Sequence, residues 1–498
     1  MASKPSSTEP KQRLRWPSQM ARPSEEGAAW SSDRVELRGL DLAEHVLLVQ
    51  RSDAWQRLMS PVCRQVDKQR SRCGRKFLYT TEELELVLLF GRAAGKTSYK
   101  DTRDLLAGDR SASRRLLGLD HARNASSGRV TKLRDGVPSE ATMSRHKRRF
   151  AEKTRVEIWV EIEKQIRKEH LETPELQAEL GQLQLDGSSL RTHYRCPVKN
   201  KKRSGMKNVP VTCADGGYVG RTAGPDKAGH GWNLVLISTS SQDPLNWALV
   251  PLNESEMNTA LEMVKGDFKN ETAPYLSARG DKIAALTADG AFKKPELRAA
   301  LRRLGVLENI HLASHADKSE ARASKMTEQR FPIHGYANWK ANGHREVICR
   351  CGRRAAKTIT KNDRGEVIAR VQGKCPTCGS VSITSGDWRF TKKSGFVRCK
   401  TTDSDKRRDW ALGNGLTFRD PVAAVLGKSR FSRQEGLFSA LTTRFHLLDQ
   451  KRWFRRMDQA KIEVAMTLTL IHALALEQRR RAREARAGDP PGDLRLAA

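Results

Sequence analysis

The sequence lacks a long apolar run. Its most apolar stretch, residues 464–476, is interrupted by Thr467, Thr469 and His472, whereas a helix that crosses a bilayer needs about 20 apolar residues. The first 32 residues are polar and rich in Pro and Ser, so they also lack the apolar core of a signal peptide. These absences predict a cytoplasmic protein that has no membrane partner.

Cysteine is scarce, with nine residues among 498. Because no secretory signal is visible, we expect the chain to work in a reducing compartment. Paired cysteines bind metal ions there more often than they form disulfides. His472, within the apolar run, is expected to be an ordinary core histidine.

Acidic residues are strongly outnumbered. Asp and Glu total 58 against 91 Lys and Arg, which leaves a formal net charge of +33. A field of this sign attracts polyanions, because each neutralised phosphate of a nucleic acid releases counterions. The excess is spread along the chain rather than confined to one tail. Nucleic-acid binding is therefore favoured over a merely solvated basic surface.

The N-terminal third has a helical pattern. Residues 1–35 are rich in Ser, Pro and charge and predict a disordered basic N-terminus. Residues 36–172 predict a helical region for DNA binding or dimerisation, with a buried helix over 84–90 that Thr80 or Thr81 caps. Gly91–Thr97 has the wrong glycine spacing for a phosphate loop and follows a helix, so it is interpreted as a helix end.

A second helix is expected after Ser139, a capping residue type. It carries a run of basic or potentially basic side chains, of which Arg145, Lys147, Arg148 and Arg149 are candidates for DNA contact. The alternative is an ordinary solvated basic face.

From residue 173 the pattern changes to α/β. Strands are expected over 183–186, 232–238, 247–251 and 283–290 and near Ile310, with helices over 253–264, where Asn253 is the cap, and over 294–304. Two of these strands end in Asp-Gly, at Asp186 and Asp289. A helix over 437–445 follows Glu435. Two strand-end aspartates and a helical glutamate can converge on two Mg²⁺ or Mn²⁺ ions, since these hard cations prefer oxygen ligands.

Three blocks resemble the acidic motifs of bacterial insertion-sequence DDE transposases: residues 184–188, residues 287–292, and residues 432–439 with Arg444 and Phe445. Residues 137–150 resemble the Pro-Ser-x-x-Thr-x-Ser-Arg segment that ends the helical N-terminal region of these enzymes. The resemblance covers about residues 35–480. It implies a ribonuclease-H-like core, a mixed sheet flanked by helices, in which Asp186, Asp289 and Glu435 are the catalytic, metal-binding residues.

Asp289 and Glu435 are 146 residues apart, more than a compact core needs. Within the gap, Cys349, Cys351, Cys375 and Cys378 form two pairs, each followed by Gly, which predicts a zinc ribbon with a structural Zn²⁺. Because one residue rather than two separates the first pair, His344 or Cys399 is an alternative ligand. Cys196 and Cys213 flank a basic loop without a metal-binding spacing.

These patterns predict core segments over 173–320 and 425–478, an inserted zinc-ribbon domain over 321–424, and a basic tail over 479–498. The expected activity is cleavage of transposon-end DNA and joining of its 3′-hydroxyl to target DNA, by a homodimer or higher oligomer bound to inverted repeats in a bacterial nucleoid. Alternatives are a ribonuclease-H-like nuclease or resolvase and a non-catalytic DNA-binding regulator. Further expected DNA contacts are Lys201, Lys202, Arg203, Arg433 and Arg444.

Overall fold

The computed structural model divides the chain into two compact units. The helix–sheet unit comprises Ser24–Ala278 and Arg430–Ala498, and the strand unit comprises Met1–Pro23 and Arg279–Ser429. The residues that the structure describes are 42–71, 79–117, 137–174, 176, 181–198, 210–220, 228–239, 242–266, 285–289, 292, 296–297, 300–301, 304, 306–310, 333–339, 345–349, 354–355, 357–361, 367–375, 379–384, 388–391, 395–398, 437–448, 451 and 453–488.

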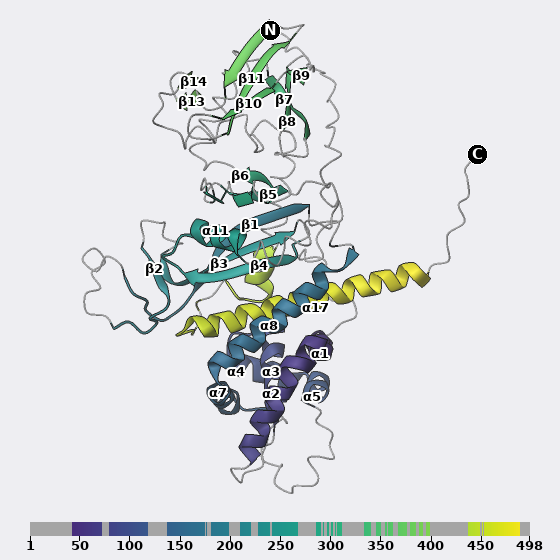
Figure 1. Ribbon diagram of the computed structural model, residues 1–498. Coiled ribbons are helices and arrows are strands. Elements are labelled where there is room, and N and C mark those ends of the chain that lie inside the picture. Colours follow the sequence, from purple (N-terminus) through teal and green to yellow (C-terminus); the bar gives the residue numbers. More distant parts are fainter. Residues whose placement is uncertain are drawn as a thin grey trace, which may run out of the picture. The chain divides into compact units, whose positions relative to one another are not determined.

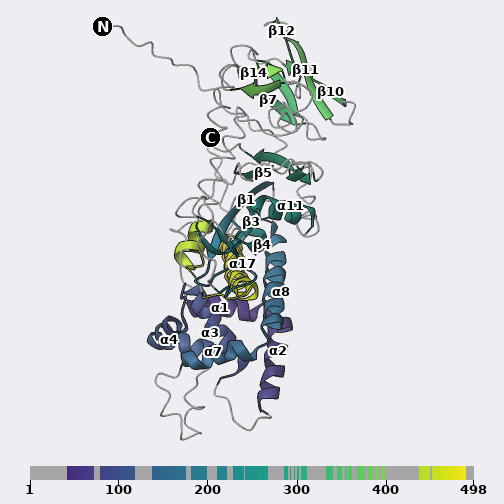
Figure 2. The ribbon, with the colours of Figure 1, turned by 90° about the vertical axis from the view of Figure 1, so that its left-hand side faces the viewer.

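The helix–sheet unit contains a helical layer (Figure 1). Its helices are α1 (Leu42–Arg51), α2 (Asp53–Ser71), α3 (Thr81–Ala93), α4 (Tyr99–Gly108), α5 (Arg110–Leu117), α7 (Glu140–Arg149), α8 (Glu152–Leu171), the π-helix η6 (Ala440–Arg444) and α17 (Met457–Gly488). The long helix α17 packs against α1, α3 and α8, and α8 lies beside α2 (Figure 2). The first residues of the layer thus pack against its last helix.

Helix α3 begins and ends where its sequence predicts. The Thr80 hydroxyl accepts the Glu83 N–H, and the Glu83 carboxylate accepts the Thr80 N–H, which forms a capping box. After Ala93 the chain turns at Gly95, whose φ of +66° favours glycine. The segment around residues 91–97 is therefore a helix end and not a phosphate loop, as expected.

The sheet of this unit is antiparallel. It contains β1 (Gln182–Arg191), β2 (Gly217–Val219), β3 (Gly229–Thr239) and β4 (Pro244–Pro251). Strand β3 pairs with β1 on one side and with both β2 and β4 on the other. The predicted strands are confirmed, although β1 and β3 are longer than expected. The short strand β2 was not predicted.

Different helices pack on the two faces of the sheet. Side chains directly opposite one another on neighbouring strands share a face: Asp186 lies opposite Leu236, and Leu236 opposite Trp247. The Trp247 indole N–H donates to Glu163 of α8 at 3.1 Å, so the helical layer covers this face. On the other face, a Cβ at Gly187 would lie 2.8 Å from the carboxyl carbon of Glu256, at the start of α11 (Glu256–Lys265).

Two predicted helix ends were wrong. The N-cap of α11 is Ser255 rather than Asn253, because residues 251–254 still form the turn that leaves β4. Helix α17 continues through Gly488, into the segment predicted to be a basic tail. Arg480 and Arg481 pair there with Glu477, one turn earlier, at 2.6 and 2.7 Å, and such pairs support an exposed helix.

Helix α17 is apolar and long enough, by length and composition, to cross a membrane over Met457–Glu484. However, 78% of its most apolar window is buried inside the structure. Core helices of soluble folds commonly combine this composition with this degree of burial. The result therefore adds little support for a membrane span.

A buried chain of acids and histidines joins α8, α17 and the start of β4. His472, buried as predicted, contacts His170 Nδ1 to Nδ1 at 3.1 Å and Glu163 at 3.4 Å. His170 lies 3.4 Å from Asp243, which Arg479 neutralises at 2.9 Å. Burial lowers the pKa of His170 to about 3. This histidine is therefore neutral in the folded protein at neutral pH.

The strand unit begins with the parallel pair β5 (Ala285–Ala288) and β6 (Leu307–Ile310), so the chain as a whole is mixed α/β. Strand β6 ends at Ile310, where a strand was predicted to begin. A helix was predicted over residues 294–304, between the two strands. Most of the residues that the structure describes in this range are helical. Three antiparallel groups follow: β7 (Ile333–Trp339), β8 (Arg345–Cys349) and β9 (Arg354–Ala355); β10 (Lys357–Lys361), β11 (Val367–Cys375) and β12 (Gly379–Thr384); and β13 (Trp388–Thr391) with β14 (Gly395–Arg398).

Candidate functional site

Asp186 is the one acidic residue on the four strands β1–β4. It is half-buried, and one of its carboxylate oxygens accepts the Gly187 N–H at 2.9 Å. The predicted strand end at Asp186 was wrong, because β1 pairs with β3 as far as Arg191. Gly187 suggested a turn, but its missing Cβ instead lets Glu256 approach the strand. The carboxylate of Asp186 therefore lies in mid-strand, on the face that the helical layer covers.

The chain that follows Glu435 belongs to the apolar core of the helix–sheet unit. Leu437, Leu441 and Phe445 are fully buried and belong to one apolar cluster with Leu236, the residue opposite Asp186. Glu435 itself lies outside the described residues. Residue 437, two positions after the predicted third carboxylate, thus lies in the same core as the residue opposite Asp186.

The segment 437–447 is not the simple α-helix that its spacing predicted. Residues Ala440–Arg444 form the π-helix η6. The buried Arg92 of α3 donates to the Phe445 carbonyl at 3.0 Å and pairs with Glu463 of α17, also at 3.0 Å. Arg92 thereby fastens the segment to two helices of the layer. π-Helical turns are frequent at functional sites.

Asp289 directly follows β5 and is half-buried, so its predicted place at a strand end is confirmed. This residue belongs to the strand unit, whereas Asp186 belongs to the helix–sheet unit. The expected convergence of Asp186, Asp289 and Glu435 therefore stays a prediction.

Two of the four predicted zinc ligands lie at strand ends. Cys349 ends β8, and Cys375 ends β11, where it pairs with Gly379 at the start of β12. Strands β11 and β12 are thus an antiparallel pair that begins at Cys375 and Gly379, and cysteine pairs lie between two such strands in zinc ribbons. Cys351 and Cys378, with the alternative ligands His344 and Cys399, lie outside the described residues. Within the described part of the chain, no group of three or more metal-binding side chains comes together.

The predicted basic helix is α7, with Ser139 as its N-cap. Its basic side chains do not share one environment. Arg145 is exposed, whereas His146 is buried against Glu85 at 2.7 Å. Lys147 lies 3.6 Å from Glu463 and over the ring of Tyr99. The side chains of Arg148 and Arg149, and the residues Lys201, Lys202, Arg203 and Arg433, lie outside the description.

Arg444, another predicted DNA contact, ends η6. Its guanidinium lies 5.3 Å from the ring centroid of Phe445, and burial lowers its pKa to about 10. It is still charged at neutral pH, but it is half-buried. Arg444 is therefore partly a packing residue of the helical layer.

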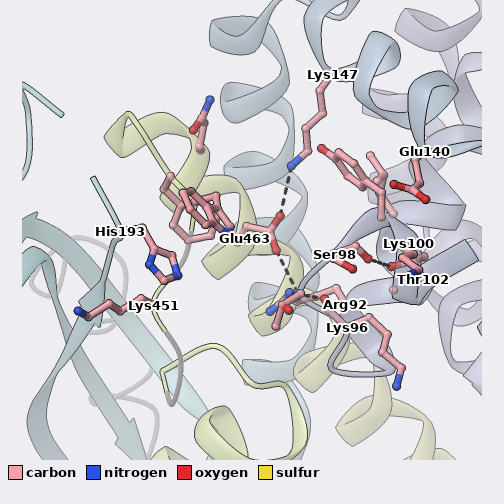
Figure 3. A pocket seen from close by; sticks show the side chains of 17 residues that line it. Arg92, Lys96, Ser98, Lys100, Thr102, Glu140, Lys147, His193, Lys451 and Glu463 are labelled. Carbon is pink, nitrogen blue, oxygen red and sulfur yellow. Dashed lines mark hydrogen bonds and ion pairs between the residues drawn. The ribbon is translucent and has the colours of Figure 1, made fainter. Parts of the chain in front are cut away.

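One basic site of the described residues was not predicted. It is a cavity of 520 Å³ within the helix–sheet unit, here called the basic pocket (Figure 3). Its Arg, Lys and His lining residues are Arg92, Lys96, Lys100, Lys147, His193 and Lys451. In Figure 3, Arg92 and Lys147 both reach Glu463. Four sequence segments far apart in the chain form this pocket, so no local motif signals it.

Cys196 and Cys213 meet despite their unpromising spacing. Both are buried, and a Cβ placed on Gly216 would lie 2.5 Å from one sulfur and 3.0 Å from the other. The Cys196 N–H donates to His230 Nδ1 at 2.9 Å. A hydrogen bond from Cys213, together with His230, lowers the pKa of Cys196. The pair closes the basic loop between them at its base.

No family model and no curated protein matches the chain. Similar solved structures include a piggyBac transposase synaptic complex with hairpin DNA, at 12% identity and a TM-score of 0.40, over 90% of this chain and 77% of that one. A pre-cleavage Mos1 transpososome is similar at 12% identity and a TM-score of 0.17, over 51% of this chain and 85% of that one. Both are transposase complexes. At these scores neither likeness carries an inference about this chain.

Proposed function

We propose that the chain is a metal-dependent DNA transposase that cuts a transposon end and joins the freed 3′-hydroxyl to target DNA. Asp186, Asp289 and Glu435 would hold two Mg²⁺ or Mn²⁺ ions. The observation that carries the proposal is the place of Asp186. It is the one acid on β1–β4, and Leu437, two residues after Glu435, belongs to the same apolar core as Leu236, which lies opposite Asp186.

The donor set suits this role. Burying half of a carboxylate costs desolvation free energy, and a bound divalent cation would offset that cost at Asp186. Carboxylate oxygens match the preference of hard divalent cations. Bound ions would stabilise the charge that develops on the attacking and leaving oxygens of a phosphodiester. The Gly187 N–H orients one Asp186 oxygen, and the apolar helical layer limits access of water to this face.

Double-stranded DNA is the proposed partner, both as inverted repeats and as target. The net charge of +33 supports binding to phosphates. On the helical layer, Arg145 is exposed on α7 and free of close carboxylates among the described residues. A homodimer or higher oligomer on DNA in the bacterial cytoplasm is part of the proposal.

Glu435→Gln is expected to abolish both cleavage and joining on DNA that carries the element's ends, while DNA binding is retained. The reason is that the amide keeps the size of the side chain and loses the charge that holds the cation. Gel analysis of labelled ends and of a target plasmid measures the two steps. Glu157→Gln, an exposed position on α8, is the matched control. Unchanged cleavage by Glu435→Gln would refute the proposal, and cleavage without joined product in the wild type would favour the nuclease alternative.

We propose a zinc ribbon in the segment 321–424. Elemental analysis of the purified chain is expected to find about one Zn²⁺ per chain, since four thiolates close a structural site. Cys375→Ser is expected to lose most of it, whereas Cys63→Ser, on α2, keeps it. Stoichiometric zinc in Cys375→Ser would contradict the ribbon.

A further inference from the structure

Trp453 exposes 70% of its surface at the edge of the basic pocket. Val211 is the other large apolar side chain found exposed among the described residues. Exposed apolar side chains need no explanation when they are scattered singly. Trp453 is not single: its ring stacks on His193, with centroids 4.3 Å apart and planes at 23°, and meets Tyr194 edge-on at 5.8 Å. The three rings form an aromatic platform.

Hydrogen bonds and packing fix the chain that follows Trp453. Phe454 is buried against Trp232, and its carbonyl accepts the Thr192 hydroxyl at 2.7 Å. The Met457 N–H, at the start of α17, donates to Asp215 at 2.6 Å. The chain that follows Trp453 is therefore held by residues next to the ends of β1 and β2. A ring that is already ordered loses little conformational entropy when a ligand stacks on it.

The pocket beside the platform has an uncompensated positive charge. Arg92 and Lys147 are neutralised in part by Glu463, at 3.0 and 3.6 Å. The other lysines of the lining are Lys96, Lys100 and Lys451. None of these three has an ion pair with a carboxylate within the described part of the chain. The remaining lining acid, Glu140, lies 3.7 Å from Arg103.

Accessible aromatic faces combined with lysines indicate the class of ligand. Within a duplex each base already stacks on its neighbours, so a stacking partner needs an unpaired base. Lysines bind the phosphates on either side without reading sequence. The pocket volume of 520 Å³ lies in the range of small-ligand sites. A pocket of this size can hold part of a single nucleic-acid strand but not a duplex.

We propose that the basic pocket and its aromatic platform bind single-stranded DNA, with a base on Trp453 and phosphates on Lys96, Lys100 and Lys451. The site is distinct from Asp186, the proposed catalytic carboxylate of the same unit. His193 lies seven residues beyond Asp186, and an extended chain that rises about 3.3 Å per residue spans roughly 23 Å over that distance. Binding here goes beyond the proposed function, because it does not depend on cleavage.

Fluorescence anisotropy with a labelled oligo(dT) and a labelled blunt duplex tests the site. Trp453→Ala is expected to weaken binding of the single strand roughly 5- to 150-fold, the loss of one stacked base, and to leave duplex binding within about twofold. Trp453→Phe keeps a ring and is expected to recover most of the affinity. Lys451→Ala is expected to flatten the salt dependence of oligo(dT) binding, since about 0.7 of a counterion is released per phosphate on single strands.

Two control variants, an RNA probe and a test of folding accompany this experiment. Val211→Ala removes the other exposed apolar side chain and is expected to change nothing. Asp186→Asn is expected to bind oligo(dT) normally, so loss of catalysis and loss of this site are distinguishable. Unaltered oligo(dT) binding in Trp453→Ala, or an equal loss on the duplex, would overturn the proposal. A loss seen with oligo(U) alone would overturn its assignment to DNA. Urea unfolding checks that the variants fold.

Discussion

Asp186→Asn is expected to lower cleavage of end-bearing DNA by at least roughly 10²–10³-fold, the usual cost of removing one group that stabilises transition-state charge. Asparagine has nearly the same size and still accepts the Gly187 N–H that Asp186 accepts at 2.9 Å. The change therefore removes negative charge and leaves the local strand geometry in place. Gel assays of labelled ends in Mg²⁺ measure the rate.

The control for Asp186→Asn is Asp104→Asn. Asp104 lies on α4 and pairs with Arg103 at the surface, so its loss removes the same charge far from the sheet. We expect cleavage by this control to equal that of the wild type. Both variants should bind end DNA with unchanged affinity. If Asp186→Asn cut DNA at the wild-type rate, Asp186 would have no part in the reaction.

The second large effect is on stability. Glu85 of α3 is fully buried. Its two oxygens accept from Arg155 at 2.7 and 3.0 Å, from the Trp159 indole at 3.0 Å, and contact His146 at 2.7 Å. Glu85→Ala would leave Arg155 buried without its counter-ion. Breaking a buried pair from one side costs about 3–5 kcal/mol, so we expect a loss of this size in the free energy of urea unfolding.

The pH dependence of this loss has a definite sign. Burial opposes ionisation of Glu85, but Arg155 and His146 outweigh it and hold the pKa of this carboxyl well below its usual range. The group therefore stabilises the folded state above the unfolded pKa of about 4.3, and this contribution is lost as the pH falls below that value. The difference in unfolding free energy between the wild type and Glu85→Gln is expected to shrink from pH 6 to pH 3.

Glu157→Ala serves as the stability control. Glu157 is exposed and lies 4.0 Å from Lys153 on the same helix, and exposed pairs of this kind contribute roughly 0.3–0.5 kcal/mol. A loss in Glu85→Ala no larger than that of Glu157→Ala would show that the buried network contributes nothing. A difference between wild type and Glu85→Gln that grew toward low pH would contradict the charged state assigned to Glu85.

Local signals predicted individual elements well. The capping residues of α3 and α7, the apolar spacing of α3 and the apolar runs of β3 and β4 act within a few residues, and the structure confirms them. The predicted ends of elements were wrong where contacts with residues distant in sequence decide them. Gly187 suggested a turn from sequence, yet it continues a strand, because Glu256 of α11 needs the space of a missing Cβ.

The role of single side chains was less predictable. His146 belongs to a basic run that favoured DNA contact, but in three dimensions it meets Glu85, which is 61 residues earlier in the chain. The basic pocket joins the turn after α3, helix α7, the end of β1 and the segment before α17. Each segment taken alone reads as ordinary solvated charge.

Composition and short-range pattern alone established a very basic α/β chain with an acid on its first strand and another at a strand end, because charge and periodicity are local properties of the sequence. Tertiary structure decided which face of β1 carries Asp186, that the chain after Glu435 joins the core of the helix–sheet unit, and that Trp453 lies beside several lysines. Those facts depend on contacts between residues hundreds of positions apart, and only the packing of helices on the sheet determines them.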